Sequence, residues 1–140
     1  MSAPQNIKLA VPFFMVSNME TSLQFYIEKL GFKLVNQWTP RGRIEWCWLQ
    51  RDGVSLMLQE TQNDYNGEHR SNGVSIAFQC ADALILYHEF IAKDVEIREP
   101  FVGNNNWVVV FTDPDGYKLD FESRTDAPEG ITYSEWLKNQ

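Results

Sequence analysis

The sequence lacks any apolar run that approaches the roughly 20 residues needed to cross a bilayer. Its first six residues, Met1 to Asn6, lack the basic and apolar regions of a signal peptide. We therefore expect a cytoplasmic protein that is not inserted in a membrane.

Positive charge is also scarce. The chain has 12 Lys and Arg against 19 Asp and Glu, which gives a formal net charge of −7. No cluster of basic residues forms a stripe along the sequence, so repulsion disfavours binding to nucleic acid or to an anionic membrane surface. We expect neither of these partners.

Reactive and metal-ligating residues are few. The two cysteines, Cys47 and Cys80, lie singly in strand-like segments without a CxxC pattern, which is typical of reduced core thiols. Of the two histidines, His69 falls in a polar segment and His88 in an apolar helix, where partial burial without function is the default. The sequence contains no HExxH spacing, Gly-rich phosphate loop or Ser-His-Asp order.

What the sequence does contain is a well-marked hairpin near its C-terminal end. Residues 107–111 are aromatic and β-branched, and Tyr117, Leu119 and Phe121 alternate with polar residues after them. Between these segments, Asp113 to Gly116 has the turn-forming sequence Asp-Pro-Asp-Gly. We predict two strands joined by a tight turn, with carboxylates on one face.

The same plan appears earlier in the chain. Residues 46–58 align with this hairpin so that Asp52-Gly53 matches Asp115-Gly116 and Met57 matches Asp120. Residues 11–30 likewise match residues 75–93, each a strand followed by a helix. The chain is therefore one βαβββ unit written twice. We predict an α+β fold in a single domain: a first module over 8–60, a second over 73–123, and a C-terminal extension over 124–140.

The predicted elements follow from local patterns. Ser17 and Glu20 have the spacing of a capping box for the first helix, and Thr132 and Glu135 have the same spacing for a short last helix that docks through Trp136 and Leu137. Residues 61–72 form a polar linker between the modules. The other expected elements are strands over 8–16, 32–38, 73–80 and 95–102, and helices over 18–30 and 83–92.

Alternation along the strands predicts two different faces. One face packs against the helices and contains Leu56, Leu58, Ile76, Phe78, Leu119 and Phe121. The other face lines the concavity of a curled sheet. It carries Val11, Phe13, Met15, Met57, Gln59, Ser75, Ala77, Gln79, Lys118, Asp120 and Glu122.

Two motifs carry a family resemblance. Residues 16–32, which include Phe25-Tyr26 and Leu30-Gly31-Phe32, and residues 113–121 together resemble the vicinal oxygen chelate superfamily. That superfamily includes glyoxalase I, extradiol dioxygenases, and fosfomycin and bleomycin resistance proteins. The resemblance implies two βαβββ repeats that form a curled mixed sheet around a cavity. It says less about activity, because the fold hosts several chemistries.

The resemblance also implies where a divalent metal would be held. The matching positions are Val11, Met57, Ser75 and Asp120, and among these only Asp120 is a good ligand for a hard ion. We therefore expect no metal and no cofactor. Residues 11–12 and 56–60 resemble the bleomycin resistance proteins, which lack the metal and bind a drug between the subunits of a dimer.

We accordingly predict a homodimer that binds or sequesters a small aromatic or cationic molecule, with a role of the antibiotic-resistance type. The tryptophans, which include Trp38, supply flat apolar area for a planar ligand, and the carboxylates favour a cationic one. Packing in the core or at a dimer interface is an equal alternative to ligand contact for the tryptophans. The expected ligand-binding residues are Phe13, Trp46, Trp48, Met57, Ser75, Trp107, Asp120 and Glu122.

Two alternatives remain open. One is a metal-dependent lyase, isomerase or dioxygenase with a relocated site made of Asp120, Glu122, Glu60 and His69. In that case Asp120 is the candidate catalytic residue, acting as a general base, although a hydrogen bond to Ser75 or Lys118 is the more ordinary state of its carboxylate. The other is a dimer with a purely structural role.

Overall fold

The computed structural model of this chain describes residues 5–62 and 70–140. In the first module, four strands form a sheet in the order β1-β4-β3-β2, with β1 parallel to β4 and the other neighbours antiparallel. Its elements are β1 (Phe13–Val16), α1 (Met19–Leu23), the π-helix η1 (Gln24–Lys29), β2 (Lys33–Trp38), β3 (Trp46–Arg51) and β4 (Val54–Glu60).

The second module repeats this arrangement. Its sheet has the order β5-β8-β7-β6, again with the first strand parallel to its neighbour and the others antiparallel. Its elements are β5 (Ser75–Gln79), α2 (Ala83–Ala92), β6 (Phe101–Gly103), β7 (Asn106–Thr112) and β8 (Lys118–Arg124), and α3 (Tyr133–Lys138) follows. The predicted duplication of one βαβββ unit in an α+β fold is confirmed.

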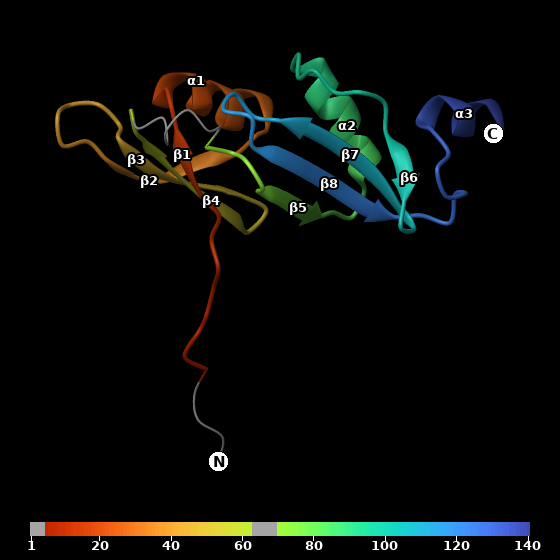
Figure 1. Ribbon diagram of the computed structural model, residues 1–140, viewed down its shortest axis with the longest axis horizontal. Helices are drawn as coiled ribbons and strands as arrows, with labels where there is room; N and C mark the ends of the chain where they lie inside the picture. Colours follow the sequence, from red (N-terminus) through yellow and green to blue (C-terminus); the bar gives the residue numbers. More distant parts are fainter. Residues whose placement is uncertain (1–4, 63–69) are drawn as a thin grey trace.

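The two sheets lie side by side, with α1 and α2 on the same side of them (Figure 1). Because both helices lie on one side, the other face of each sheet has no helix on it, and the two sheets do not close on each other. Among residues 5–62 and 70–140, no helix has the length and apolar character of a membrane span.

Several predicted boundaries are wrong. The first strand begins at Phe13 rather than Lys8, and the strand expected over 95–102 is reduced to Phe101–Gly103. The first helix is capped by the Asn18 side chain, which accepts a hydrogen bond from the Thr21 amide at 3.0 Å, and not by Ser17. Most of the predicted linker, including His69, lies outside the described residues.

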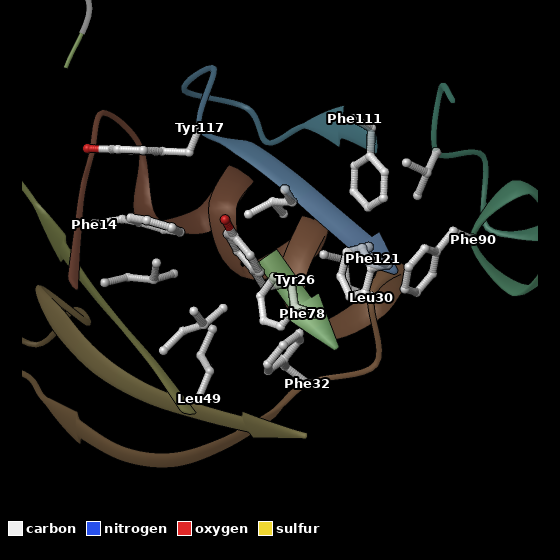
Figure 2. Close-up of a cluster of buried hydrophobic side chains, with 14 of the residues drawn as sticks. Phe14, Tyr26, Leu30, Phe32, Leu49, Phe78, Phe90, Phe111, Tyr117 and Phe121 are labelled. Carbon is white, nitrogen blue, oxygen red and sulfur yellow. The ribbon is translucent and has the colours of Figure 1, made fainter. Parts of the chain in front are cut away.

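Aromatic side chains join the two modules into one core (Figure 2). The ring of Phe14 on β1 stacks on Tyr117 with centroids 4.2 Å apart. Phe32 meets Phe78 of the second module edge-on at 6.5 Å. Burial of such large rings on both sides of the junction stabilises the contact between the modules.

The Asp-Pro-Asp-Gly turn fastens this junction. The Asp113 carboxylate accepts hydrogen bonds from the backbone amides of Asp115 and Tyr117, each at 2.9 Å, and Gly116 has a φ of +88°. The buried Tyr26 hydroxyl of η1 also donates to Asp113, at 2.7 Å. The predicted turn is confirmed, and it is locked to the helix of the other module.

The C-terminal extension covers the outer edge of the second sheet. The amide of Val102 on β6 donates to the Ile131 carbonyl at 3.0 Å, and the Gly130 amide donates back to Val102 at 2.8 Å. The predicted capping box of Thr132 and Glu135 is present at the start of α3. Trp136 docks as expected, but Leu137 is 50% exposed and does not.

Candidate functional site

The helix-free faces of the two sheets, here called the open faces, carry most of the predicted ligand-binding residues. The register of the first sheet places Phe13, Met57 and Trp48 in one row across β1, β4 and β3. A second row runs from Met15 through Gln59 and Trp46 to Trp38 on β2. Three tryptophans therefore share this face, and Phe13 beside them is 43% exposed.

The open face of the second sheet is more polar. Ser75 lies opposite Lys118, Ala77 opposite Asp120, and Gln79 opposite Glu122 across β5 and β8. The Gln79 amide nitrogen donates to the Glu122 carboxylate at 3.1 Å. The opposite faces of both sheets are buried, with Leu56, Leu58, Leu119 and Phe121 at their centre. The division of side chains between two faces is as the alternation predicted.

Asp120 is the most unusual side chain on this surface. Its strand neighbours are Ala77 and Val110, and neither side chain can donate a hydrogen bond. The Oδ1 atom of Asp120 is buried and has no hydrogen-bond partner among the described residues. The bond expected from Ser75 or Lys118 is therefore not made at this atom. A buried acceptor without a donor costs about 1–3 kcal/mol, so Asp120 favours any ligand that brings one.

The electrostatic state of Asp120 reflects this environment. Burial is the main cause that raises the pKa of the Asp120 carboxyl, while Lys118 lowers that pKa and Glu122 raises it. A negative charge in this position gains from a nearby cation, since opposite charge favours the ionised form. The open faces thus carry one unpaired acceptor on the second sheet and an aromatic surface on the first.

Trp107 does not lie on the open face. In the pairing of β7 with β8 it is opposite Ser123, whereas Val108 and Val110 are opposite Glu122 and Asp120. Its ring is 5% exposed and packs edge-on against Tyr133 and Trp136 of the C-terminal extension. Trp107 therefore does not share a sheet face with Asp120, because it falls in the odd-numbered, core-facing set of β7.

The family metal does not fit these residues. Val11 has no donor atom and precedes β1, Met57 offers a thioether on the first sheet, and Ser75 and Asp120 lie on the second. Divalent ions of this kind require several carboxylate or imidazole donors around one point. Within residues 5–62 and 70–140, no group of three His, Cys, Asp or Glu side chains could hold an ion.

The residues of the alternative, relocated metal site are not all close together in the structure either. Glu60 accepts a hydrogen bond from the Met19 amide at 2.7 Å and pairs with Arg43, beside α1 on the helix side of the first sheet. Asp120 and Glu122 are on the open face of the other sheet. His69 lies outside the described residues.

A groove between the modules was not foreseen from the sequence. It has a volume of about 460 Å³ and is lined by Phe32, Phe78, Cys80 and Leu86, among others. Arg51 and Glu89 also line it, and Arg51 donates to the two Glu89 carboxylate oxygens at 2.7 and 3.0 Å. These partners are 38 residues apart, so no local pattern could have paired them. None of the eight predicted ligand-binding residues lines it.

A duplicated βαβββ unit with helices on one side and an exposed sheet face on the other defines the glyoxalase-like class of α+β proteins. Comparison with known families agrees with this class. The chain belongs to the glyoxalase/bleomycin resistance protein/dioxygenase superfamily, whose family model matches residues 8–121. The C-terminal extension with α3 lies beyond the matched region.

Individual relatives are more distant. An uncharacterized protein of Bacillus subtilis, YurT, is 28% identical over 120 residues, which cover 79% of this chain and 94% of that protein. An integron cassette protein from the mobile metagenome of the Halifax Harbour sewage outfall has a TM-score of 0.66 at 26% identity, with 84% of this chain and 99% of that protein covered.

TnmS3, an antibiotic-binding protein from Streptomyces sp. CB03234, has a TM-score of 0.66 at 18% identity, with 86% of this chain and 100% of TnmS3 covered. At that identity the likeness shows the shared fold alone.

Proposed function

We propose that this protein is a cytoplasmic homodimer that binds a small aromatic cation on its open faces and sequesters it without chemical change. The ligand stacks on the indole rings of the first sheet and donates a hydrogen bond to Asp120 on the second. In this proposal the binding residues are Phe13, Trp46, Trp48, Met57, Ser75, Asp120 and Glu122, and Trp107 has a structural role instead.

The unpaired Oδ1 atom of Asp120 is the observation that carries the proposal. A buried carboxylate oxygen without a donor is destabilising unless something else supplies an N–H or O–H group. A charged donor also offsets the desolvation that raises the pKa of Asp120. An amine or amidine nitrogen satisfies both requirements, whereas an anionic ligand satisfies neither.

The tryptophans support the aromatic part of the ligand. Trp46 and Trp48 are half-buried on β3, so their rings are held by neighbours and still present surface to a ligand. Stacking of aromatic rings contributes about 0.5–1.5 kcal/mol beyond the area buried, and a cation over an indole contributes a similar amount. A planar cation therefore fits better than a neutral aliphatic molecule.

Dimerisation is part of the proposal because a single chain leaves the ligand uncovered. Binding sites for small molecules usually bury 70–90% of the ligand. The two sheets of one chain do not close on each other, so a ligand on their open faces is covered by protein on one side only. A second copy placed against these faces would cover the exposed side of the ligand.

An antibiotic is the ligand class that the relatives favour. TnmS3, which shares the fold, is described as an antibiotic-binding protein. Many antibiotics combine fused rings with amino groups, the chemistry that Trp46, Trp48 and Asp120 suit. Sequestration of such a molecule would give a resistance role.

Calorimetric titration with matched ligands tests the proposal. A planar cation, such as an aminoacridine, is compared with a neutral and an anionic compound of the same ring size. We expect binding of the cation, and at least tenfold weaker binding to Asp120→Asn, because hydrogen bonds to charged groups are worth about 1.5–3 kcal/mol. Asp126→Asn, at a fully exposed carboxylate in the extension, is the control and should bind normally.

Two results would overturn the proposal. One is that no planar cation binds at millimolar concentration. The other is binding that is equally strong in Asp120→Asn and in Trp48→Leu, which would place the ligand elsewhere.

A further inference from the structure

The groove between the two modules, which the proposed open-face site does not use, has a base of packed aromatic rings. The rings of Phe78 and Phe121 are stacked with centroids 4.5 Å apart, and Phe32 meets Phe78 edge-on (Figure 2). All three line the groove, whose volume is about 460 Å³. Pockets for small molecules measure roughly 300–1,000 Å³, so the groove has the size of a ligand site.

Two exposed apolar side chains, one from each module, also line the groove. Val54 at the start of β4 is 43% exposed, and Ile85 on α2 is 64% exposed. The partly buried Leu86 adds apolar area beside Ile85. An apolar part of a ligand that lies against these side chains removes their surface from water, which favours binding.

The side chains of this groove suit an aliphatic group better than an aromatic ring. Phe121 stacks on Phe111 as well as on Phe78, and Phe78 is 8% exposed, so these rings offer little free face for stacking. The exposed apolar surface comes instead from Val54 and Ile85, which are aliphatic.

The charges that line the groove favour a cation. The charged lining residues are Asp52, Asp82, Glu89 and Arg51, so three carboxylates and one guanidinium give a net charge of −2. Arg51 already donates to both Glu89 oxygens and, at 2.6 Å, to the Leu30 carbonyl. Its Nε atom lies 3.7 Å from Asp52 as well. One guanidinium is therefore shared among several acceptors, and a second cation would find carboxylate oxygens to bind.

Arg51 is held in this position by the backbone beside it. Gly31 has a φ of +79°, and a Cβ atom there would lie 2.9 Å from the Arg51 Nη1 atom, so only glycine allows this close approach. An anionic ligand would have to take Arg51 away from Leu30 and Glu89, whereas a cation leaves these bonds in place.

We propose that the groove is a second small-molecule site, separate from the open faces, and that it binds a primary amine with a short aliphatic tail. The tail lies between Val54 and Ile85 over the ring of Phe78. The ammonium group donates to Asp82, whose Oδ1 atom already caps α2 and whose other oxygen faces a new donor, and to Asp52.

Calorimetric titration with hexylamine, hexanol and hexanoate tests the charge preference, because the three share one tail. We expect hexylamine to bind about fivefold more tightly than hexanol, as modest ion pairs near a surface allow, and hexanoate to bind most weakly. Asp52→Asn combined with Asp82→Asn should abolish this preference. Asn remains a good helix cap and tolerates the φ of +50° at residue 52. Asp94→Asn, at an aspartate with a φ of +64° that does not line the groove, is the matched control.

Labelling of Cys80 locates the bound amine. Cys80 lines the groove and is half-buried, whereas Cys47 is buried. Its thiolate attacks a methanethiosulfonate reagent, which forms a mixed disulfide and releases methanesulfinate, and mass spectrometry measures the rate. We expect hexylamine, but not hexanoate, to slow this labelling several-fold. The cationic trimethylammonium reagent should also react faster than the anionic sulfonate reagent, by more than their ratio for free mercaptoethanol.

Four results would overturn the inference: no binding of hexylamine at millimolar concentration, equal binding of hexanol or hexanoate, hexylamine binding that leaves Cys80 labelling unchanged, or full affinity in the double aspartate variant. If that variant does not fold, Ile85→Lys replaces it. Ile85 is exposed on α2, so the chain should fold, and the added ammonium should weaken hexylamine binding about fivefold or more by repulsion.

This inference and the open-face proposal can fail separately. Protection of Cys80 by hexylamine, with the same affinity in Asp120→Asn, supports the groove whether or not a planar cation binds the open faces. Hexylamine binding that is lost in Asp120→Asn and kept in Asp82→Asn would place the amine on the open face. That result overturns the groove inference and leaves the open-face proposal standing.

Discussion

At the scale of single residues, the raised pKa of Asp120 predicts that the proposed cation binding depends on pH. The cation needs an ionised carboxylate, so we expect its affinity to fall on acidification through a midpoint above 3.8, the ordinary pKa of an aspartate. Titrations by calorimetry from pH 7 to pH 4 measure this midpoint. In Asp120→Asn the affinity should be low and nearly independent of pH over that range.

The unliganded protein should respond in the opposite direction. Folding raises the pKa of Asp120, so the folded state binds its proton more readily than the unfolded state does. The carboxyl therefore disfavours folding at neutral pH, and this unfavourable effect is relieved as the pH falls through the raised pKa. Asp120→Asn should accordingly leave the free protein as stable as the parent or slightly more stable at pH 7.

Tyr26 makes the second prediction at this scale. Its buried hydroxyl donates to Asp113, so Tyr26→Phe removes a donor from a buried carboxylate. We expect a loss of about 1–3 kcal/mol in the free energy of unfolding by urea at pH 7. Tyr87→Phe, whose half-buried ring contacts His88 and Tyr133 and whose hydroxyl makes no hydrogen bond among the described residues, is the control and should change stability little.

The same variant also has a pH signature. Burial is the main cause that raises the pKa of Asp113, and the hydrogen bond from Tyr26 lowers it. A protonated Asp113 needs the donor less, so the difference between Tyr26→Phe and the parent should shrink as the pH falls through the raised pKa. A difference that grows on acidification would contradict the assigned role of this hydrogen bond.

At the scale of elements, the C-terminal extension protects an edge and a tryptophan. Trp136 packs against Trp107 at 5.5 Å, and residues 130–131 bond to β6. We expect Trp136→Ala to lower the free energy of unfolding by about 1–3 kcal/mol, measured by urea denaturation, because a large aromatic contact is lost. Leu137→Ala should have less than half that effect, since Leu137 is 50% exposed.

The elements also show where sequence reasoning works. The turn at Asp113 to Gly116 and the capping box of Thr132 and Glu135 were predicted because their residues act on neighbours in the chain. The prediction of a strand over 95–102 is wrong for most of that range. Val95 and Ile97 are apolar because they pack on the core, and neither belongs to a strand. Periodicity alone cannot separate these two causes of an apolar residue.

At the scale of the whole molecule, the proposed dimer and its ligand make stability depend on concentration. In the proposed function only the folded dimer holds the ligand, so we expect the melting temperature to rise with protein concentration and to rise further with the cation. At 100 times its dissociation constant, a ligand adds about 2.7 kcal/mol to stability. Scanning calorimetry over a hundredfold range of protein measures both, and a melting temperature that ignores protein concentration would contradict the dimer.

The sequence by itself determined the duplicated unit, the two faces of each strand and the absence of a good donor set at the four matched metal positions. These properties depend on residue type and on the two-residue period of a strand, which are local. Only the tertiary structure decided that Trp107 lies in the core, that Arg51 meets Glu89, and that Asp120 keeps an oxygen unpaired. Each of these depends on which strands and helices become neighbours, and neighbours in space are set by packing of the whole chain.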